Sequence, residues 1–266
     1  MPSSDLAPLV PLGAAYCFVL GACLASFLQV VAQRAAVPGS PPFYKGRSHC
    51  DACGHALGAA ELVPLFSWLL LRGRCRHCGA RVPASYPLAE LCGGLGAALC
   101  FAAFPFQWGR LAVVALPAFF VLFLIALQDA YTMEIPDLYS LLLCLPALAA
   151  LWAFPETGLA ARLIGAVCVS LPLLLVTLAV PGAFGGGDIQ LMAVCGFLLG
   201  WKQCLAGFFL ALLIAGAQAV FLLASGRAKA GQGAHMPFGP ALCAGCFLSL
   251  LWGGPLVAWY MGFFQF

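Results

Sequence analysis

Long apolar stretches, interrupted by a few charged residues, dominate the pattern of polar and non-polar positions along the chain. A helix needs about 20 mostly apolar residues to cross the hydrocarbon core of a bilayer. The pattern therefore predicts about eight transmembrane helices. The uncharged stretches cover residues 6–33, 91–109, 111–128, 138–155, 163–187, 189–201, 203–226 and 230–266. The sixth is too short to cross alone unless Asp188 enters the membrane or the helix is irregular.

Composition agrees with this pattern. Hydrophobic residues make up 64% of the 266 residues, charged residues 8%, and the mean hydropathy is +1.02, far from the values of a soluble domain. Asp5 and the lack of a preceding basic residue favour a retained first helix over a secretory signal. We expect an all-α polytopic membrane protein with a first transmembrane helix (1–33), a small cytoplasmic loop domain (34–85) and a transmembrane core (86–266).

The distribution of basic residues predicts the orientation. In an eight-span arrangement with the N-terminus outside, three basic residues lie outside: Arg110, Arg162 and Lys202. Nine lie inside: Arg34, Lys45, Arg47, Arg72, Arg74, Arg76, Arg81, Arg227 and Lys229. The positive-inside rule then places the loops at 34–85, 129–137 and 181–188 on the cytoplasmic side. Basic residues in the first loop attract anionic lipid, so we expect membrane lipid as a partner and no nucleic acid.

The first loop carries two CxxC pairs, each followed by glycine. The pairs are Cys50 with Cys53 and Cys75 with Cys78. Such turns direct two thiolates at one metal ion, and a reducing cytoplasmic face disfavours the alternatives of disulfides or redox CxxC motifs. We expect a structural zinc ion with four sulfur ligands and no open coordination position. Three histidines beside the pairs are alternative ligands or solvated loop residues: His49, His55 and His77.

Two aspartates lie where charge is costly. Asp129 ends the third apolar stretch, and Asp188 follows three glycines before the sixth. An aspartate at the centre of a membrane helix costs on the order of 3 kcal/mol, so each is a candidate functional residue. Two carboxylates close together cannot both ionise cheaply and share a proton. Such a pair can activate a water with one member and protonate a leaving amine with the other, which hydrolyses a peptide bond.

The glycines before Asp188 fit this hypothesis. Gly185, Gly186 and Gly187 would release the backbone from helical geometry, permit positive φ and leave room for an extended substrate. An ordinary helix start capped by Asp188 is the alternative. Capping also explains Asp137, which follows Pro136 at the start of the fourth stretch.

At this point the motifs resemble those of the type IV prepilin leader peptidases, which are also N-methyltransferases and belong to the GxGD class of membrane aspartic proteases. The resemblance covers nearly the whole chain. In order, it rests on GACLASFLQVVAQR at 21–34, the two CxxC pairs, SYPLAE at 85–90, Asp129 with Pro136-Asp137, GGGD at 185–188 and PFGP at 237–240.

The resemblance implies that Asp129 and Asp188 are catalytic and that Gly185 and Gly187 form the GxGD turn. It implies cleavage of the leader of type IV prepilins or type II secretion pseudopilins at the cytoplasmic face of the bacterial inner membrane. It also implies methylation of the new N-terminus by S-adenosylmethionine, although the sequence itself defines no site for that molecule. Glu90 lines such a site or lies at the membrane interface.

Two positions depart from the family pattern. Gln190 replaces a common lysine, and Gln29 replaces a common asparagine.

Other functions remain open. An ion-coupled transporter is the main alternative because it also uses intramembrane aspartates, although no internal repeat is evident. The sequence lacks HExxH and GxSxG, which argues against zinc and serine proteases. A pilus-assembly scaffold would give no reason for the two aspartates.

Overall fold

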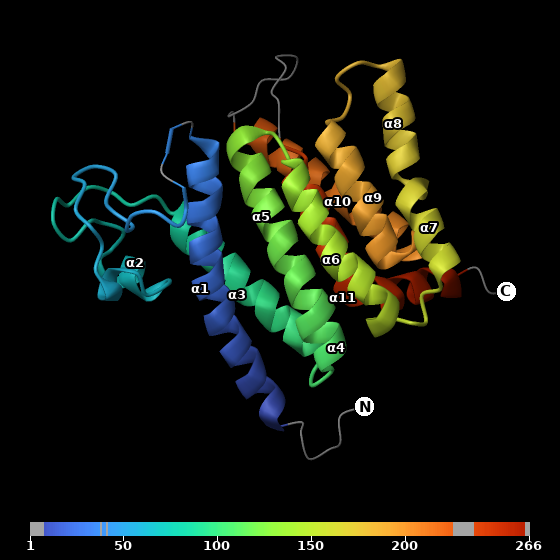
Figure 1. The fold of residues 1–266 in the computed structure, drawn as a ribbon, viewed down its shortest axis with the longest axis horizontal. Coiled ribbons are helices and arrows are strands. Elements are labelled where there is room, and N and C mark those ends of the chain that lie inside the picture. Colours follow the sequence, from blue (N-terminus) through green and yellow to red (C-terminus); the bar gives the residue numbers. More distant parts are fainter. Residues whose placement is uncertain (1–7, 38, 41, 226–236, 264–266) are drawn as a thin grey trace. The chain divides into compact units, whose positions relative to one another are not determined.

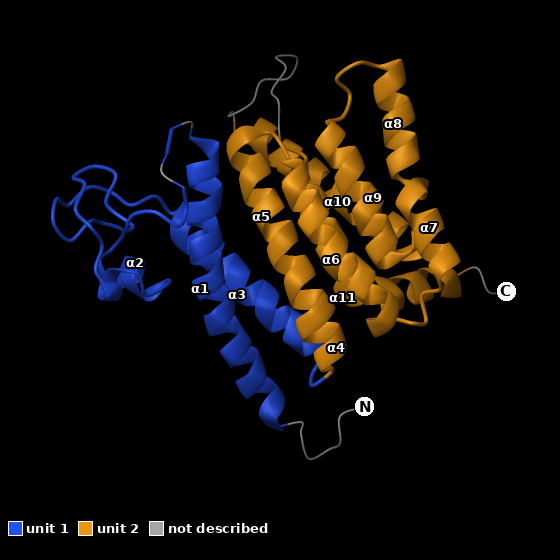
Figure 2. Ribbon diagram, in the orientation of Figure 1, with its two compact units in different colours: residues 1–106 blue, residues 107–266 orange. Residues whose placement is uncertain are grey.

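The computed structural model describes residues 8–37, 39–40, 42–225 and 237–263 (Figure 1). Regular structure in these residues is helical, and the only pairing of extended backbone among them is two isolated β-bridges, His49–Ala56 and Arg74–Arg81. The predicted all-α class is therefore confirmed. The chain forms two compact units, residues 1–106 and 107–266 (Figure 2). The predicted division at residues 33 and 85 stays a prediction.

Within the described residues, six helical segments are long and apolar enough to cross a membrane. They are α1 (Val10–Ala36), α3 (Ser85–Ala103), α4–η3–α5 (Trp108–Thr132), α7–α8 (Leu159–Ala179), α10 (Trp201–Ala224) and α11 (Gly239–Gly262). The two apolar helices α6 (Asp137–Ala153) and α9 (Gly186–Leu199) are shorter. The chain is thus polytopic, and the eight predicted stretches correspond to these eight segments. The number that cross the bilayer stays a prediction.

Unit 1 is built on the pair α1 and α3, which pack along their length. Small residues make this possible, because a Cβ atom on Gly21 would lie 2.6 Å from both the Gly93 carbonyl oxygen and the Ala97 Cβ. Close backbone approach of this kind is the usual solution for helices in lipid. The loop between these helices carries a 3-10 helix, η2 (Ala59–Glu61), and a short helix, α2 (Phe66–Leu70).

Glu90 ties three parts of unit 1 together. Its Oε1 accepts a hydrogen bond from the Ser26 hydroxyl of α1 at 2.7 Å, and its Oε2 accepts one from the Leu65 N–H of the loop at 2.8 Å. The side chain itself belongs to α3 and is buried. Glu90 therefore holds the loop against the helix pair, a role that the sequence did not reveal.

Unit 2 is a helical bundle in which α11 packs against α5 and α10, and α9 packs against α6 and α7. The combined helix α4–η3–α5 consists of α4 (Trp108–Arg110), a π-helical turn η3 (Leu111–Ala115) and α5 (Leu116–Thr132). The second combined helix consists of α7 (Leu159–Cys168) and α8 (Ser170–Ala179). The core comprises the apolar faces of these helices and includes Ile125, Leu143 and Leu191.

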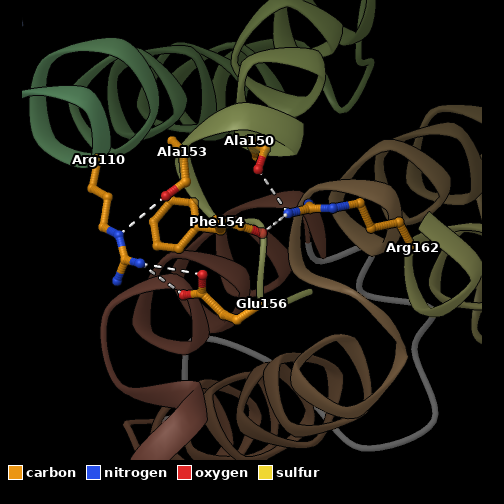
Figure 3. A network of polar contacts seen from close by, with 6 residues as sticks. All are labelled: Arg110, Ala150, Ala153, Phe154, Glu156 and Arg162. Atoms are coloured by element: carbon orange, nitrogen blue, oxygen red, sulfur yellow. Dashed lines mark hydrogen bonds and ion pairs between the residues drawn. The ribbon is translucent and has the colours of Figure 1, made fainter. Parts of the chain in front are cut away.

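Arg162 is fully buried in this bundle, although the sequence pattern places it among the basic residues outside the membrane helices. Its guanidinium donates to two carbonyls at the end of α6, those of Ala150 at 2.8 Å and Phe154 at 3.0 Å (Figure 3). Further bonds go to the carbonyls of Thr157 (3.0 Å), Phe197 (3.1 Å) and Leu198 (2.6 Å). The last carbonyls of a helix have no intrahelical partner. Arg162 of α7 therefore caps both α6 and α9.

Arg110 lies nearer the surface of the same region. It forms an ion pair with Glu156 at 3.0 Å and donates to the Ala153 carbonyl at 3.1 Å (Figure 3). Its guanidinium also lies over the Phe154 ring, 4.8 Å from the centroid. Both ion-pair partners are partly exposed, so this contact contributes less than the Arg162 network. Arg227 and Lys229, used for the predicted orientation, and Asp5, used to predict a retained first helix, lie outside the described residues.

Candidate active site and metal centre

Asp129 lies in the last turn of α5 and is buried, with 5% of its surface exposed. The helix ends at Thr132, because the next residue, Met133, takes a left-handed conformation and donates its N–H to the Asp129 carbonyl at 2.8 Å. The Asp129 carboxylate accepts the backbone N–H of Gly239 at 2.9 Å. Gly239 is the first residue of α11, so the carboxylate satisfies one of the free N–H groups at the positive end of a 24-residue helix.

Asp188 lies in the first turn of α9, whose N-cap residue is Gly185. Gly185 lies beside the Asp188 side chain, since a Cβ atom on Gly185 would lie 3.4 Å from Asp188 Oδ2. A helix start is therefore present, but its N-cap is Gly185 and not Asp188. The predicted departure from helical geometry is wrong for Gly186 and Gly187, which belong to α9, and none of the three glycines has positive φ. A helix satisfies more backbone hydrogen bonds in an apolar setting than a free turn does.

Gly187 serves a different purpose from the one predicted. A Cβ atom on this residue would lie 2.7 Å from the Cβ of Ile135, in the loop between α5 and α6. The absence of a side chain thus lets the start of α9 contact the loop that follows Asp129. Ile135 was not singled out from the sequence, because an isolated apolar loop residue gives no local signal.

Further contacts place both aspartates near the start of α11. The rings of Phe184, before α9, and Phe238, before α11, have centroids 6.2 Å apart. The carboxylate of Asp129 lies close enough to that of Asp188 for their charges to interact. Both carboxylates also lie near the thiol of Cys243, a buried residue of α11. Residues far apart in sequence therefore converge where α5 ends and where α9 and α11 begin. Asp137, by contrast, is exposed at the first residue of α6 and makes no side-chain capping bond.

The departures from the family pattern lie in different surroundings. Gln190 is exposed on α9, two residues beyond Asp188. Gln29 is 1% exposed in α1 of unit 1. Gln190 can therefore affect the surroundings of Asp188 within unit 2, whereas Gln29 belongs to the helix pair that carries the cysteine loop.

The four loop cysteines converge as predicted. The sulfur atoms of Cys50, Cys53, Cys75 and Cys78 all lie within 4.8 Å of one another, and Cys50 Sγ lies 3.9 Å from Cys78 Sγ. A tetrahedral ion with bonds of about 2.3 Å separates its sulfur ligands by about 3.8 Å. The donor set and spacing therefore fit a four-sulfur metal site.

Both knuckles have the same backbone pattern. Cys50 N–H donates to the His55 carbonyl at 2.9 Å, and Cys75 N–H donates to the Ala80 carbonyl at 2.8 Å. The N–H groups of Cys78 and His77 donate to the Cys75 sulfur and lower its pKa to about 7. This favours the thiolate, which is the form that binds metal.

These features define a class: a polytopic helical membrane protein with one buried and one half-buried aspartate at helix ends in one unit and four converging cysteines in the other. Two family models match the chain, the bacterial peptidase A24 N-terminal domain over residues 19–104 and the type IV leader peptidase family over residues 116–220. The chain belongs to the type IV leader peptidase family.

Curated relatives match along most of their length. A prepilin leader peptidase/N-methyltransferase of Bacillus subtilis (strain 168) is 35% identical, over 92% of this chain and 96% of the relative. One of Burkholderia pseudomallei (strain K96243) is 36% identical, over 91% and 86%, respectively. One of Aeromonas hydrophila is 34% identical, over 81% and 74%. No solved structure matches the chain significantly. None of these matches supports the transporter alternative.

Proposed function

We propose that this chain is a prepilin leader peptidase and N-methyltransferase of the bacterial inner membrane. The convergence of Asp129 and Asp188 at the start of α11 is the observation that carries the peptidase assignment. The family membership and the names of the relatives support the substrate class, type IV prepilins or the related pseudopilins. The excess of basic residues in the first loop supports an active site at the cytoplasmic face.

In the proposed reaction, Asp129 and Asp188 share one proton. The ionised carboxylate takes a proton from water, and the water oxygen attacks the scissile carbonyl carbon. The protonated carboxylate then gives its proton to the leaving nitrogen as the C–N bond breaks. The Gly239 N–H keeps the Asp129 carboxylate in place, and contact between Gly187 and Ile135 keeps the α9 turn near it. Gly185 adds no side chain beside the Asp188 carboxylate.

The second activity would methylate the amine that cleavage creates. S-adenosylmethionine is the methyl donor and is consumed as a substrate: the amine nitrogen bonds to the methyl carbon, the carbon–sulfur bond breaks, and a proton leaves the nitrogen. Zn²⁺ is the ion that we assign to Cys50, Cys53, Cys75 and Cys78, because tetrahedral four-sulfur sites suit it. Such a site is closed, so the ion stabilises the loop.

Mass spectrometry of a prepilin incubated with the purified protein and S-adenosylmethionine tests both activities. We expect loss of the leader mass and gain of one methyl group. Asp129→Asn and Asp188→Asn should each abolish cleavage, while the matched control Asp137→Asn, which changes an exposed aspartate, should retain it. Substantial cleavage by both Asp129→Asn and Asp188→Asn would refute the pair. Cleavage without methylation would restrict the function to the peptidase.

A further inference from the structure

A second group of metal-ligating side chains lies beside the four sulfurs. His55, Glu61 and His77 present ligand atoms that all lie within 4.8 Å of one another. The two imidazole rings face each other with centroids 3.4 Å apart and planes inclined at 34°. Both histidines are exposed, and Glu61 is half-buried. We refer to these three residues as the His/Glu cluster.

The knuckle turns themselves fix the two histidines. The N–H of His55 donates to the Cys53 sulfur, and the N–H of His77 donates to the Cys75 sulfur. The carbonyl of His55 accepts the Cys50 N–H at 2.9 Å. The hydrogen bonds that shape the four-sulfur site therefore also hold the backbone of both histidines, which places the two imidazoles next to each other while leaving the rings free to rotate.

Glu61 is positioned independently. It ends the 3-10 helix η2, and its Oε2 accepts the N–H of Gly58 at 2.8 Å in a capping box. This bond fixes the carboxylate close to the two rings. A ligating carboxylate that is itself hydrogen-bonded is the usual arrangement in metal sites.

The cluster is chemically distinct from the four-sulfur site. The four cysteines already complete a tetrahedral set, so the histidines are not needed as its ligands. Two imidazole nitrogens and one carboxylate oxygen suit a divalent transition metal, and three protein ligands leave a coordination position open. With bonds of about 2.1 Å, ligand atoms on one ion lie at most about 4.2 Å apart. Small rotations of the two exposed imidazoles bring the observed atoms into that range.

We propose that His55, Glu61 and His77 bind a second divalent transition-metal ion, Zn²⁺ or Co²⁺ in the laboratory, with one position open to water or to a ligand from another molecule. This site goes beyond the proposed enzymatic function and does not depend on it. It makes the loop a two-metal module in which one ion is enclosed by sulfur and the other is accessible.

Titration of the full-length, metal-free protein in detergent with Co²⁺ tests the proposal. Cobalt bound to thiolates gives an intense sulfur-to-metal charge-transfer absorption, whereas cobalt bound to nitrogen and oxygen gives only weak d–d bands. We expect two equivalents to bind, one with the charge-transfer absorption and one without it. A single equivalent, or two equivalents that both develop the sulfur absorption, would overturn the proposal.

Variants then locate the second ion. Glu61→Gln keeps an oxygen acceptor for the Gly58 N–H but weakens metal binding, and His77→Asn removes one imidazole. Each should lower the metal content measured by mass spectrometry from two Zn²⁺ per chain to one, with the sulfur absorption of the Co²⁺ form retained. His49→Asn is the matched control, because His49 is exposed beside Cys50 but lies outside the cluster. Two ions per chain in both Glu61→Gln and His77→Asn would show that the second ion binds elsewhere.

Discussion

The backbone N–H of Gly239 donates a hydrogen bond to the carboxylate of Asp129, across 110 positions of sequence. The bond joins the end of α5 to the beginning of α11 and leaves no room for a side chain at residue 239. A Cβ atom there would lie 2.7 Å from Asp129 Oδ2 and 2.9 Å from Asp129 Cγ. Gly239 is therefore a positioning residue for the proposed catalytic pair.

Gly239→Ala should displace the Asp129 carboxylate and lower leader cleavage about 100-fold, since a shift of about 1 Å in a reacting group has effects of that size. The rate of leader removal from a prepilin, followed by mass spectrometry, measures the effect. Gly254→Ala is the matched control in the same helix, because its added Cβ meets only Gln203 Nε2 at 3.7 Å. Equal rates for the two variants would show that the Gly239 contact does not position Asp129.

Gly187→Ala should also lower cleavage, because its Cβ would lie 2.7 Å from the Cβ of Ile135 and push the start of α9 away from the α5–α6 loop. Overpacking of this kind costs about 1–3 kcal/mol. Ile135→Gly in the same chain removes the Cβ atom that causes the clash and should restore much of the activity. A double-mutant cycle on cleavage rate and thermal stability provides the measurement. Additive effects of the two substitutions would argue against their contact as the cause.

Arg162→Met should destabilise unit 2, because it removes the side-chain donor of the Phe197 and Leu198 carbonyls at the end of α9, whereas the Ala150 and Phe154 carbonyls keep backbone donors. An unsatisfied buried polar group costs about 1–3 kcal/mol, so the loss of the donor to these two carbonyls should cost about 2–6 kcal/mol. Thermal unfolding in detergent should show a markedly lower Tm. Glu156→Gln breaks only the partly exposed ion pair with Arg110 and should cost at most about 1 kcal/mol. A Tm for Arg162→Met equal to that of Glu156→Gln would mean that the network stabilises little.

Cys50→Ser should weaken the proposed zinc site of the loop by removing one of the four converging thiolates. We expect loss of bound Zn²⁺ from the four-sulfur site and faster proteolysis of residues 42–84, measured by elemental analysis and limited digestion. Cys144→Ser is a suitable control because Cys144 lies in α6, outside the loop. A sulfur absorption as intense in the Co²⁺ form of Cys50→Ser as in the unsubstituted protein, with an unchanged Zn²⁺ content, would contradict the predicted ligand set.

The sequence by itself determined the class of the protein and its candidate chemistry. Sparse charge revealed the apolar helices, paired CxxC spacing indicated the metal loop, and the cost of a carboxylate in an apolar stretch drew attention to Asp129 and Asp188. Each of these signals is local, because it depends on residues a few positions apart. The order of motifs then indicated the family, which the family models and relatives establish.

Only the tertiary structure decided how distant residues meet. Gly187 appeared to be a loop residue, but it lies in a helix and accommodates Ile135; Arg162 appeared to be a loop cation, but it is buried against helix ends. Glu90 and Gly239 likewise acquire their roles from partners on other elements. Such contacts depend on how the helices pack, and hydropathy along one chain contains no information about which helix ends will adjoin. The structure therefore supplied the arrangement that turns separate motifs into a site.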